Sequence, residues 1–146
     1  MTERYNLSTD TIPTIPTPHD CVIKDIAFDD EWLILTFKQG TTKLMRPEAK
    51  SLIIRIHLYD PLFFSYENRI NDNPHGECYY LIDNKELTKL CNKTCEYDYH
   101  DGKRRDYTLE YLYHYVGYLS IIIKLYCGGY YMLDITSDYI EFDWIE

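Results

Sequence analysis

Two groups of side chains in this sequence could carry chemistry, and the first is the adjacent pair His19 and Asp20. Imidazole and carboxylate groups bind divalent metals and exchange protons, so such a pair is a candidate for metal-dependent hydrolysis. The pair stands at the start of a predicted strand, where neighbouring side chains point to opposite faces. We therefore expect no shared metal ion, and we expect Asp20 to accept hydrogen bonds from backbone amides.

The second group consists of cysteines and histidines in the middle of the chain. Cys91 and Cys95 are separated by three residues, and three further possible ligands lie nearby in the sequence: Cys78, His75 and His100. Structural zinc sites usually combine two closely spaced pairs of ligands, and only one such pair is present here. Cys91 also falls on the apolar side of a short helix predicted over residues 83–93. The pattern favours buried thiols over a metal site, and we predict no cofactor.

The motifs of common enzyme classes do not occur in the sequence. It contains no GxSxG elbow, P-loop, GxGxxG turn or HExxH helix, and these motifs place a nucleophile, a phosphate cradle or a metal. We therefore predict a non-catalytic protein with no catalytic residues. A metal-dependent enzyme, at His19 and Asp20 or at the cysteines, is the third-ranked alternative.

Composition restricts the kind of partner. The 146 residues correspond to one domain, the formal net charge is −9, and 16 residues are tyrosine. Negative charge repels phosphate backbones and anionic membrane surfaces, so we expect neither nucleic-acid nor membrane binding. Tyrosine is common in strands and interfaces because its ring buries area while its hydroxyl stays hydrated. An acidic, tyrosine-rich surface suits a basic protein partner, whereas the oligomeric state stays open.

The cellular compartment is predicted from what the chain lacks. Residues 1–18 are polar, without the apolar segment of a secretory signal, and apolar runs such as residues 121–123 are far shorter than a membrane helix. The cysteine count of five is odd, so we expect free thiols. These features predict a cytoplasmic protein.

Strand patterns dominate the chain after a Pro- and Thr-rich segment. We predict an extended N-terminal arm over residues 1–18 and a single β domain over 19–146. The first prediction is a hairpin over 19–38, with a bulge between Ile23 and Ile26 and a turn at Asp29 and Asp30. An alternating strand over 51–59 and a short strand over 77–82 follow. Apolar and aromatic residues then keep one parity over 107–125, with a bend at Gly117, and two strands, 131–135 and 140–144, are separated by a turn at Ser137 and Asp138. The fold class is mainly β with a minor helical part: an antiparallel β-sandwich or a strongly curved sheet of about seven or eight strands with one short helix. The predicted core is Leu33, Leu35, Phe37, Leu52, Ile54, Ile56, Leu119, Ile121, Ile123, Phe142 and Trp144.

The His19-Asp20 step, followed by Val22-Ile23 and by Leu33-x-Leu35-x-Phe37, resembles the start of small, acidic bacterial β domains. Those domains end on an aromatic strand such as residues 139–144. Several are immunity proteins of polymorphic toxin systems, and related families are uncharacterised. The resemblance implies a cytosolic protein that inhibits a cognate toxin by occlusion, with no cofactor and no catalytic motif.

The last strand provides the candidate binding surface. Residues 134–146 contain no Lys or Arg and five acids: Asp134, Asp138, Glu141, Asp143 and Glu146. If the apolar residues of 140–144 face the core, alternation places four residues together on the opposite face: Tyr139, Glu141, Asp143 and Ile145. We predict that these four bind a basic protein, and that reversing Glu141 and Asp143 to Lys slows association while leaving the fold intact. Two alternatives remain: the acids only protect a sheet edge, or the domain is a sandwich that binds a small molecule or carbohydrate.

Overall fold

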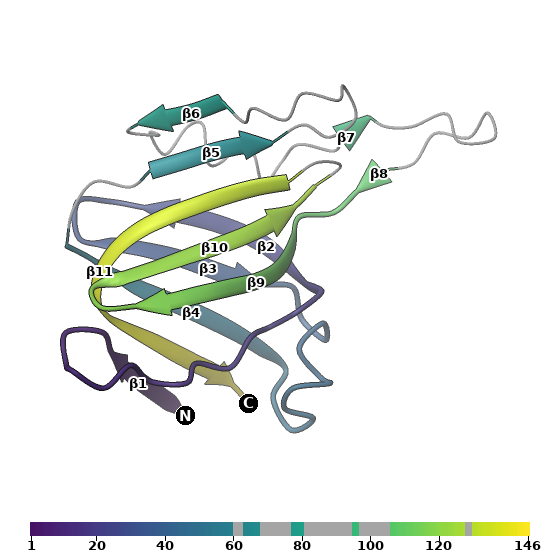
Figure 1. Cartoon of the computed structure of the whole chain (residues 1–146). Helices are drawn as coiled ribbons and strands as arrows, with labels where there is room; N and C mark the ends of the chain where they lie inside the picture. Colours follow the sequence, from purple (N-terminus) through teal and green to yellow (C-terminus); the bar gives the residue numbers. More distant parts are fainter. Residues whose placement is uncertain (60–62, 68–76, 81–94, 97–105, 128–129) are drawn as a thin grey trace.

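The computed structural model describes residues 1–59, 63–67, 77–80, 95–96, 106–127 and 130–146. In this part the chain is all β, which confirms the mainly β prediction, and every strand pairing is antiparallel (Figure 1). The strands are β1 (Thr2–Asn6), β2 (Cys21–Phe28), β3 (Trp32–Phe37), β4 (Ser51–Leu58), β5 (Phe63–Glu67), β6 (Glu77–Tyr80), β7 (Cys95–Glu96), β8 (Asp106–Tyr107), β9 (Glu110–Gly117), β10 (Ser120–Tyr126) and β11 (Tyr130–Ile145).

Two layers face each other, and the long strand β11 belongs to both (Figure 1). Its first half pairs with β10 and β5, whereas its second half pairs with β4 and β1. Strand β2 also pairs in both layers, with β3 and, at its first two residues, with β9. We call layer A the set β1, second half of β11, β4, β3 and β2, and layer B the set β9, β10, first half of β11, β5 and β6. Strands that bend from one sheet into the other form the corners at which two packed sheets join around one core.

The bend of β11 corrects the predicted turn at Ser137 and Asp138. The chain does not reverse there, and β11 continues for 16 residues. The register with β4 shifts between Ser137 and Ile140, which is a bulge. Ser137 is fully buried, and its hydroxyl donates a hydrogen bond to the carbonyl oxygen of Tyr139 at 2.9 Å. This local bond lies at the bulge, where β11 passes from its pairing with β10 to its pairing with β4.

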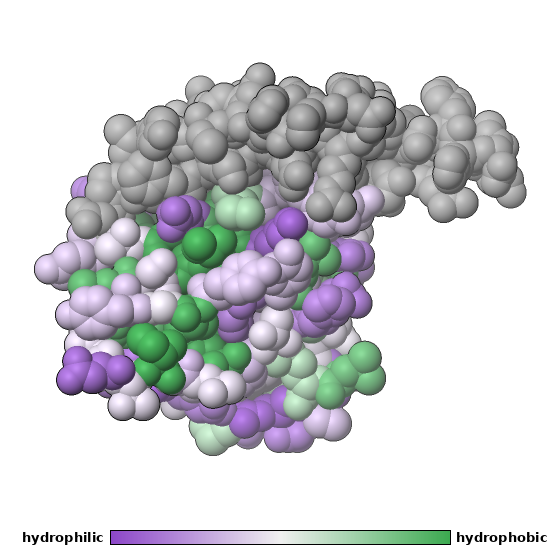
Figure 2. All heavy atoms as spheres, in the orientation of Figure 1, coloured by the Kyte–Doolittle hydropathy of each residue, from purple (hydrophilic) through white to green (hydrophobic). Residues whose placement is uncertain are grey.

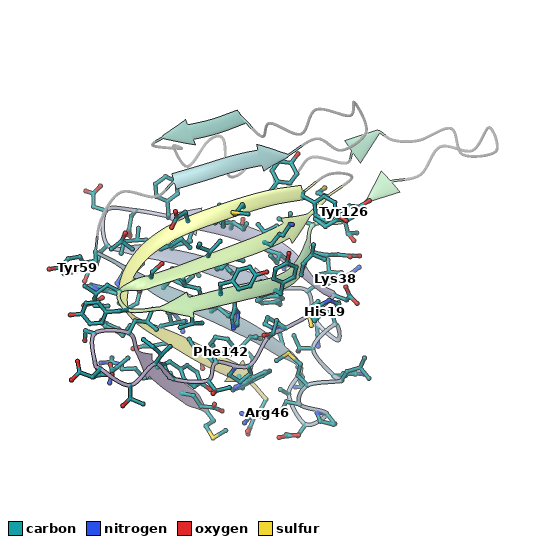
Figure 3. All side chains as sticks on the ribbon, viewed as in Figure 1. His19, Lys38, Arg46, Tyr59, Tyr126 and Phe142 are labelled. Carbon is teal, nitrogen blue, oxygen red and sulfur yellow. The ribbon has the colours of Figure 1, made fainter. Side chains whose placement is uncertain are left out.

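The core lies between the layers, and all predicted core residues are buried there except Leu119. Phe142, labelled in Figure 3, is one of the largest of these buried side chains. Leu119 instead lies in the two-residue turn between β9 and β10 and has a φ of 52°. A tight hairpin turn requires left-handed backbone, which moves this side chain out of the alternation of β10.

A second correction concerns the tyrosines of β9. The sequence predicts that Tyr111, Tyr113 and Tyr115 share one face, but the register with β10 shifts so that Lys124 is opposite Tyr113 and Leu125 is opposite Tyr111. One extra residue in β9 changes the parity of the strand. Tyr111 is therefore buried, whereas Tyr113 and Tyr115 are on the outer face of layer B.

The predicted hairpin over residues 19–38 is confirmed as β2 and β3. The register shifts between Ile23 and Asp25, where the bulge was predicted. At the turn, one carboxylate oxygen of Asp29 accepts hydrogen bonds from the amides of Glu31 and Trp32, both at 2.8 Å. These two bonds lower the pKa of Asp29 because they stabilise its charged form.

The N-terminal segment contributes more to the fold than an arm would. Residues 2–6 form β1 on the edge of β11, and Leu7 and Ile15 are buried in the core.

The predicted strand over 77–82 corresponds to β6, and β7 and β8 form a separate pair. The predicted helix over 83–93 and the cysteine and histidine group around it lie outside the residues whose side chains are described. In the described ranges, no helix is long and apolar enough to cross a membrane.

Candidate functional site

The second half of β11 carries the four residues predicted to bind a partner. Phe142 and Trp144 are buried, so their neighbours are on the opposite, outer face of layer A: Tyr139, Glu141, Asp143 and Ile145. Ile145 is among the exposed large apolar residues of the described chain. The four residues thus share one face of one strand.

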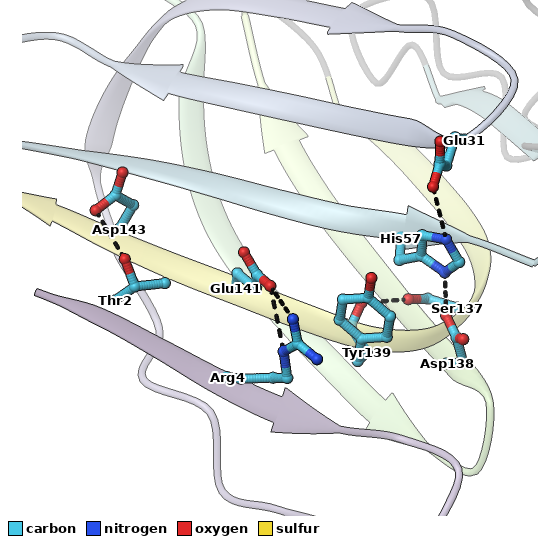
Figure 4. A network of polar contacts seen from close by, with 9 residues as sticks. All are labelled: Thr2, Arg4, Glu31, His57, Ser137, Asp138, Tyr139, Glu141 and Asp143. Atoms are coloured by element: carbon cyan, nitrogen blue, oxygen red, sulfur yellow. Dashed lines mark hydrogen bonds and ion pairs between the residues drawn. The ribbon is translucent and has the colours of Figure 1, made fainter.

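Both predicted acids are paired within the chain. The guanidinium of Arg4 in β1 lies 2.6 Å from Glu141 through Nη2, and Nη1 of Arg55 in β4 lies 3.1 Å from Asp143. The hydroxyl of Thr2 also donates a hydrogen bond to Asp143 at 3.1 Å (Figure 4). The side chains of Glu141 and Asp143 are only 17% and 24% exposed. The hydrogen bond from Arg55 lowers the pKa of Asp143, so this carboxylate is charged and neutralised locally.

These ion pairs change what charge reversal would do. A Lys at position 141 or 143 would remove an ion pair and place an ammonium group beside Arg4 or Arg55. We therefore expect reversal to lower stability as well as to change the surface charge, and the prediction that the fold stays intact awaits measurement. Residues 134–146 contain no Lys or Arg, and the positive charges that pair with these two acids come from β1 and β4, which are distant in the sequence.

A cluster of acidic and aromatic side chains lies at one end of the same face, where β3, β4 and β11 meet. We call it the His57 corner. It consists of Glu31, His57, Asp138 and Tyr139, which Figure 4 shows, together with Trp32. The His57 ring stacks on Tyr139, with ring centroids 4.7 Å apart and planes within 10°. Trp32 packs edge-on against both rings, at 5.0 Å and 5.7 Å. The guanidinium of Arg4 lies 4.3 Å from the centroid of the Tyr139 ring.

The acids of the His57 corner differ from Glu141 and Asp143 in their partners. Asp138 lies 2.5 Å from Nδ1 of His57, and Glu31 lies 3.6 Å from Nε2. Among the described residues, no Lys or Arg forms an ion pair with either carboxylate. The side chain of Glu31 is 67% exposed. This corner therefore presents negative charge beside aromatic surface, and Tyr139 is the one predicted residue that belongs to it.

Among the described residues, the His57 corner lacks the contacts that activate a nucleophile. A carboxylate only accepts hydrogen bonds, so Nδ1 of His57 carries the proton that it shares with Asp138. Ser137, next to Asp138 in the chain, is buried and donates to the Tyr139 carbonyl. Within the described ranges, no hydroxyl or thiol forms a hydrogen bond with His57. An activated nucleophile would need such a contact.

His19 and Asp20 do not adopt the arrangement predicted for a strand. Asp20 has a φ of 62° and lies just before β2, so the two side chains point toward each other at 3.0 Å instead of to opposite faces. Both are well exposed. Burial raises the pKa of the nearby Glu110, and the charge of Asp20 raises it further. In the part of the chain that the structure describes, no three His, Cys, Asp or Glu side chains converge as a metal site would require.

Two features of layer B were not identified from the sequence. The hydroxyl of Tyr111 lies 2.5 Å from Nδ1 of His114, whose Nε2 lies 3.1 Å from the carbonyl oxygen of Ile15. This chain of bonds attaches the N-terminal segment to β9, and burial lowers the pKa of His114. The second feature is the tyrosine face, which lies around Lys124 on the outer surface of layer B and is formed by Tyr113, Tyr115, Tyr126 and Tyr130. The outer surface of layer B faces the viewer in Figures 2 and 3, and Figure 3 labels Tyr126 on it.

Comparisons with protein-family models, with curated proteins and with solved structures find no match to this chain. The site must therefore be interpreted from its own geometry and charge.

Proposed function

We propose that this chain is a non-catalytic binding domain that engages a basic protein partner through the His57 corner. An immunity-like inhibitor, which occludes a basic toxin, is the form of this function that we favour. The supporting observation is that two carboxylates flank a stacked His57–Tyr139 pair and have no Lys or Arg partner among the described residues. Aromatic rings next to acids that lack a Lys or Arg partner can bury an incoming ring or guanidinium and attract its charge.

Rigidity of the corner also supports the proposal. Stacking on Tyr139, the edge contact of Trp32 and the bond to Asp138 hold His57 from three sides. A surface that is already ordered loses little conformational entropy on binding, so more of its contact energy contributes to affinity.

The experiment compares two charge reversals that differ only in position. Glu31→Lys alters the corner, whereas Glu48→Lys is the matched control: the side chains are 67% and 64% exposed, and each lies 3.6 Å from its nearest basic partner. The two residues lie near opposite ends of β4. The carbonyl of Glu31 accepts a hydrogen bond from the amide of Leu58, the last residue of β4, whereas Glu48 is three residues before Ser51, the first. Both variants should fold as the parent does, which circular dichroism and thermal melting verify.

Each tagged variant is used to isolate partners from the native host, and association with the isolated partner is then measured at low and high salt. We expect one stoichiometric, basic protein to bind the parent and Glu48→Lys equally. For Glu31→Lys we expect association to slow about tenfold at low salt, with the difference shrinking as salt is added. Equal association rates for the two variants would exclude the corner, and the lack of any stoichiometric partner of the parent would contradict a protein-binding function.

A second candidate function is carbohydrate binding at the tyrosine face. Tyr115 is exposed there and Lys124 lies 4.8 Å from the ring centroid of Tyr130, so rings and a cation share one surface. Aromatic faces can stack on sugar rings, and a few polar groups then set orientation. Glycan-array binding that is lost in Tyr115→Ala and retained in Glu31→Lys would favour this alternative over the first.

A further inference from the structure

The strand β1 covers an edge of β11 that would otherwise be open. Its pairing extends from Met1, whose carbonyl accepts a hydrogen bond from the Trp144 amide at 2.9 Å, to Leu7, whose amide donates to the Asp138 carbonyl at 2.8 Å. Within the described chain, β1 pairs with no strand other than β11. Removing β1 would expose a row of unpaired backbone groups, which is the usual template for addition of another strand.

The side chains of this edge select a particular kind of strand. On the outer face, Arg4 meets Glu141 at 2.6 Å. On the inner face, the ring of Tyr5 packs edge-on against Phe142 with centroids 5.5 Å apart. Main-chain pairing gives affinity to an added strand, and alternate side chains give it specificity. The edge therefore suits a segment with a basic residue facing outward and an aromatic residue next to it facing inward.

β1 is an edge strand followed by an exposed segment. Arg4 is largely exposed, residues 8–12 are exposed beyond the strand, and among the described residues one ion pair besides Arg4–Glu141, Glu3 with Arg46 at 2.8 Å, is formed by a side chain of β1. Leu7 and Ile15 are buried on either side of this exposed stretch. Edge strands with few buried contacts open at lower free energy than core strands. Residues 1–6 can therefore detach while Leu7 keeps its place in the core.

We propose that the β11 edge from Tyr139 to Asp143 is an acceptor site for an extended basic segment of the protein partner, and that β1 occupies it until that segment displaces it. This inference rests on the proposed function, because the segment belongs to the same basic partner. Glu141 selects a cation in the segment, and Phe142 selects an aromatic ring. The internal pairing of Glu141 with Arg4 is then the contact that the partner replaces.

The test uses the full chain and a synthetic peptide of residues 1–6 as the probe. In the parent, the attached β1 competes at an effective concentration in the millimolar range, so peptide binding is suppressed. In an Arg4→Glu chain the attached strand is repelled by Glu141, and the parent peptide should bind at least about fivefold more tightly than it binds the parent chain. A Lys24→Glu chain is the control, because it has the same charge change on an exposed residue of β2.

Charge exchange identifies the register. A Glu141→Arg chain should prefer a peptide with Glu at position 4 over the parent peptide, again by at least about fivefold. Binding is followed by chemical shifts of β11 amides in isotope-labelled chain. If the Arg4→Glu chain binds both peptides equally or binds neither, the proposal is wrong, and if that chain instead dimerises by exchanging β1, the occupant is a second copy. The peptide test needs no partner, so its failure is distinguishable from a failure at Glu31.

Discussion

Truncating Ile54 to Ala should lower the free energy of unfolding by about 3 kcal/mol, within the range of about 2–5 kcal/mol for such changes. Ile54 is 2% exposed and lies in register between Leu35 of β3 and Phe142 of β11. The change removes three carbon atoms, and their transfer from water contributes about 0.8 kcal/mol each. The remainder is the cavity, because side chains held by two neighbouring strands cannot collapse into the space.

Ile53→Ala is the matched control, since it removes the same atoms from the adjacent residue of the same strand. Ile53 is on the outer face, opposite Thr36 and Asp143, and is only partly buried. We expect a loss of about 1 kcal/mol or less there. Urea denaturation followed by tryptophan fluorescence measures both values. Equal losses, or a larger loss at Ile53, would show that the face assigned to β4 is wrong.

Three further outcomes follow from the contacts. The double variant Glu141→Lys and Asp143→Lys should lose about 1–2 kcal/mol of stability in urea denaturation, and Glu141→Gln with Asp143→Asn should lose less, because reversal adds repulsion from Arg4 and Arg55. Burial lowers the pKa of His114 from its usual 6.5, so the unfolded state binds the proton at higher pH and stability should fall as pH drops through 6.5. His114→Gln should reduce the slope of stability against pH between pH 7.5 and 5.5. An unchanged slope would contradict a lowered pKa for His114. Asp20→Gly should raise the free energy of unfolding and Asp20→Val should lower it, by about 1 kcal/mol each, because Asp20 has a positive φ; thermal melting measures both, and the reverse order would exclude this backbone geometry.

Local patterns were sufficient for much of layer A. The alternation of Leu33 and Leu35, and of Leu52, Ile54 and Ile56, predicts buried faces that the structure confirms. The Asp29 turn and the bulge after Ile23 depend on neighbouring residues, so they too could be predicted. These features have in common that their causes lie within a few residues along the chain.

Features set by distant residues could not be predicted in this way. The extra residue in β9 reverses the parity of Tyr113 relative to Tyr111, and only pairing with β10 reveals it. The bend of β11 at Ser137 depends on two layers that require the same strand. An alternating pattern carries no information about an inserted residue or a shared strand until its partners are known.

The candidate site shows the same division. Its acidic and aromatic composition, and the common face of Tyr139, Glu141 and Asp143, follow from the sequence, because side chains alternate along any strand. Which acids are neutralised was decided by the tertiary structure: Arg4 reaches Glu141 across 137 positions of sequence, whereas Asp138 lies against His57. Ion pairing acts over a few ångströms of space and is independent of sequence separation. The sequence alone determined the chemistry available on this face, and the folded chain determined which of its charges are paired with Lys or Arg within the chain.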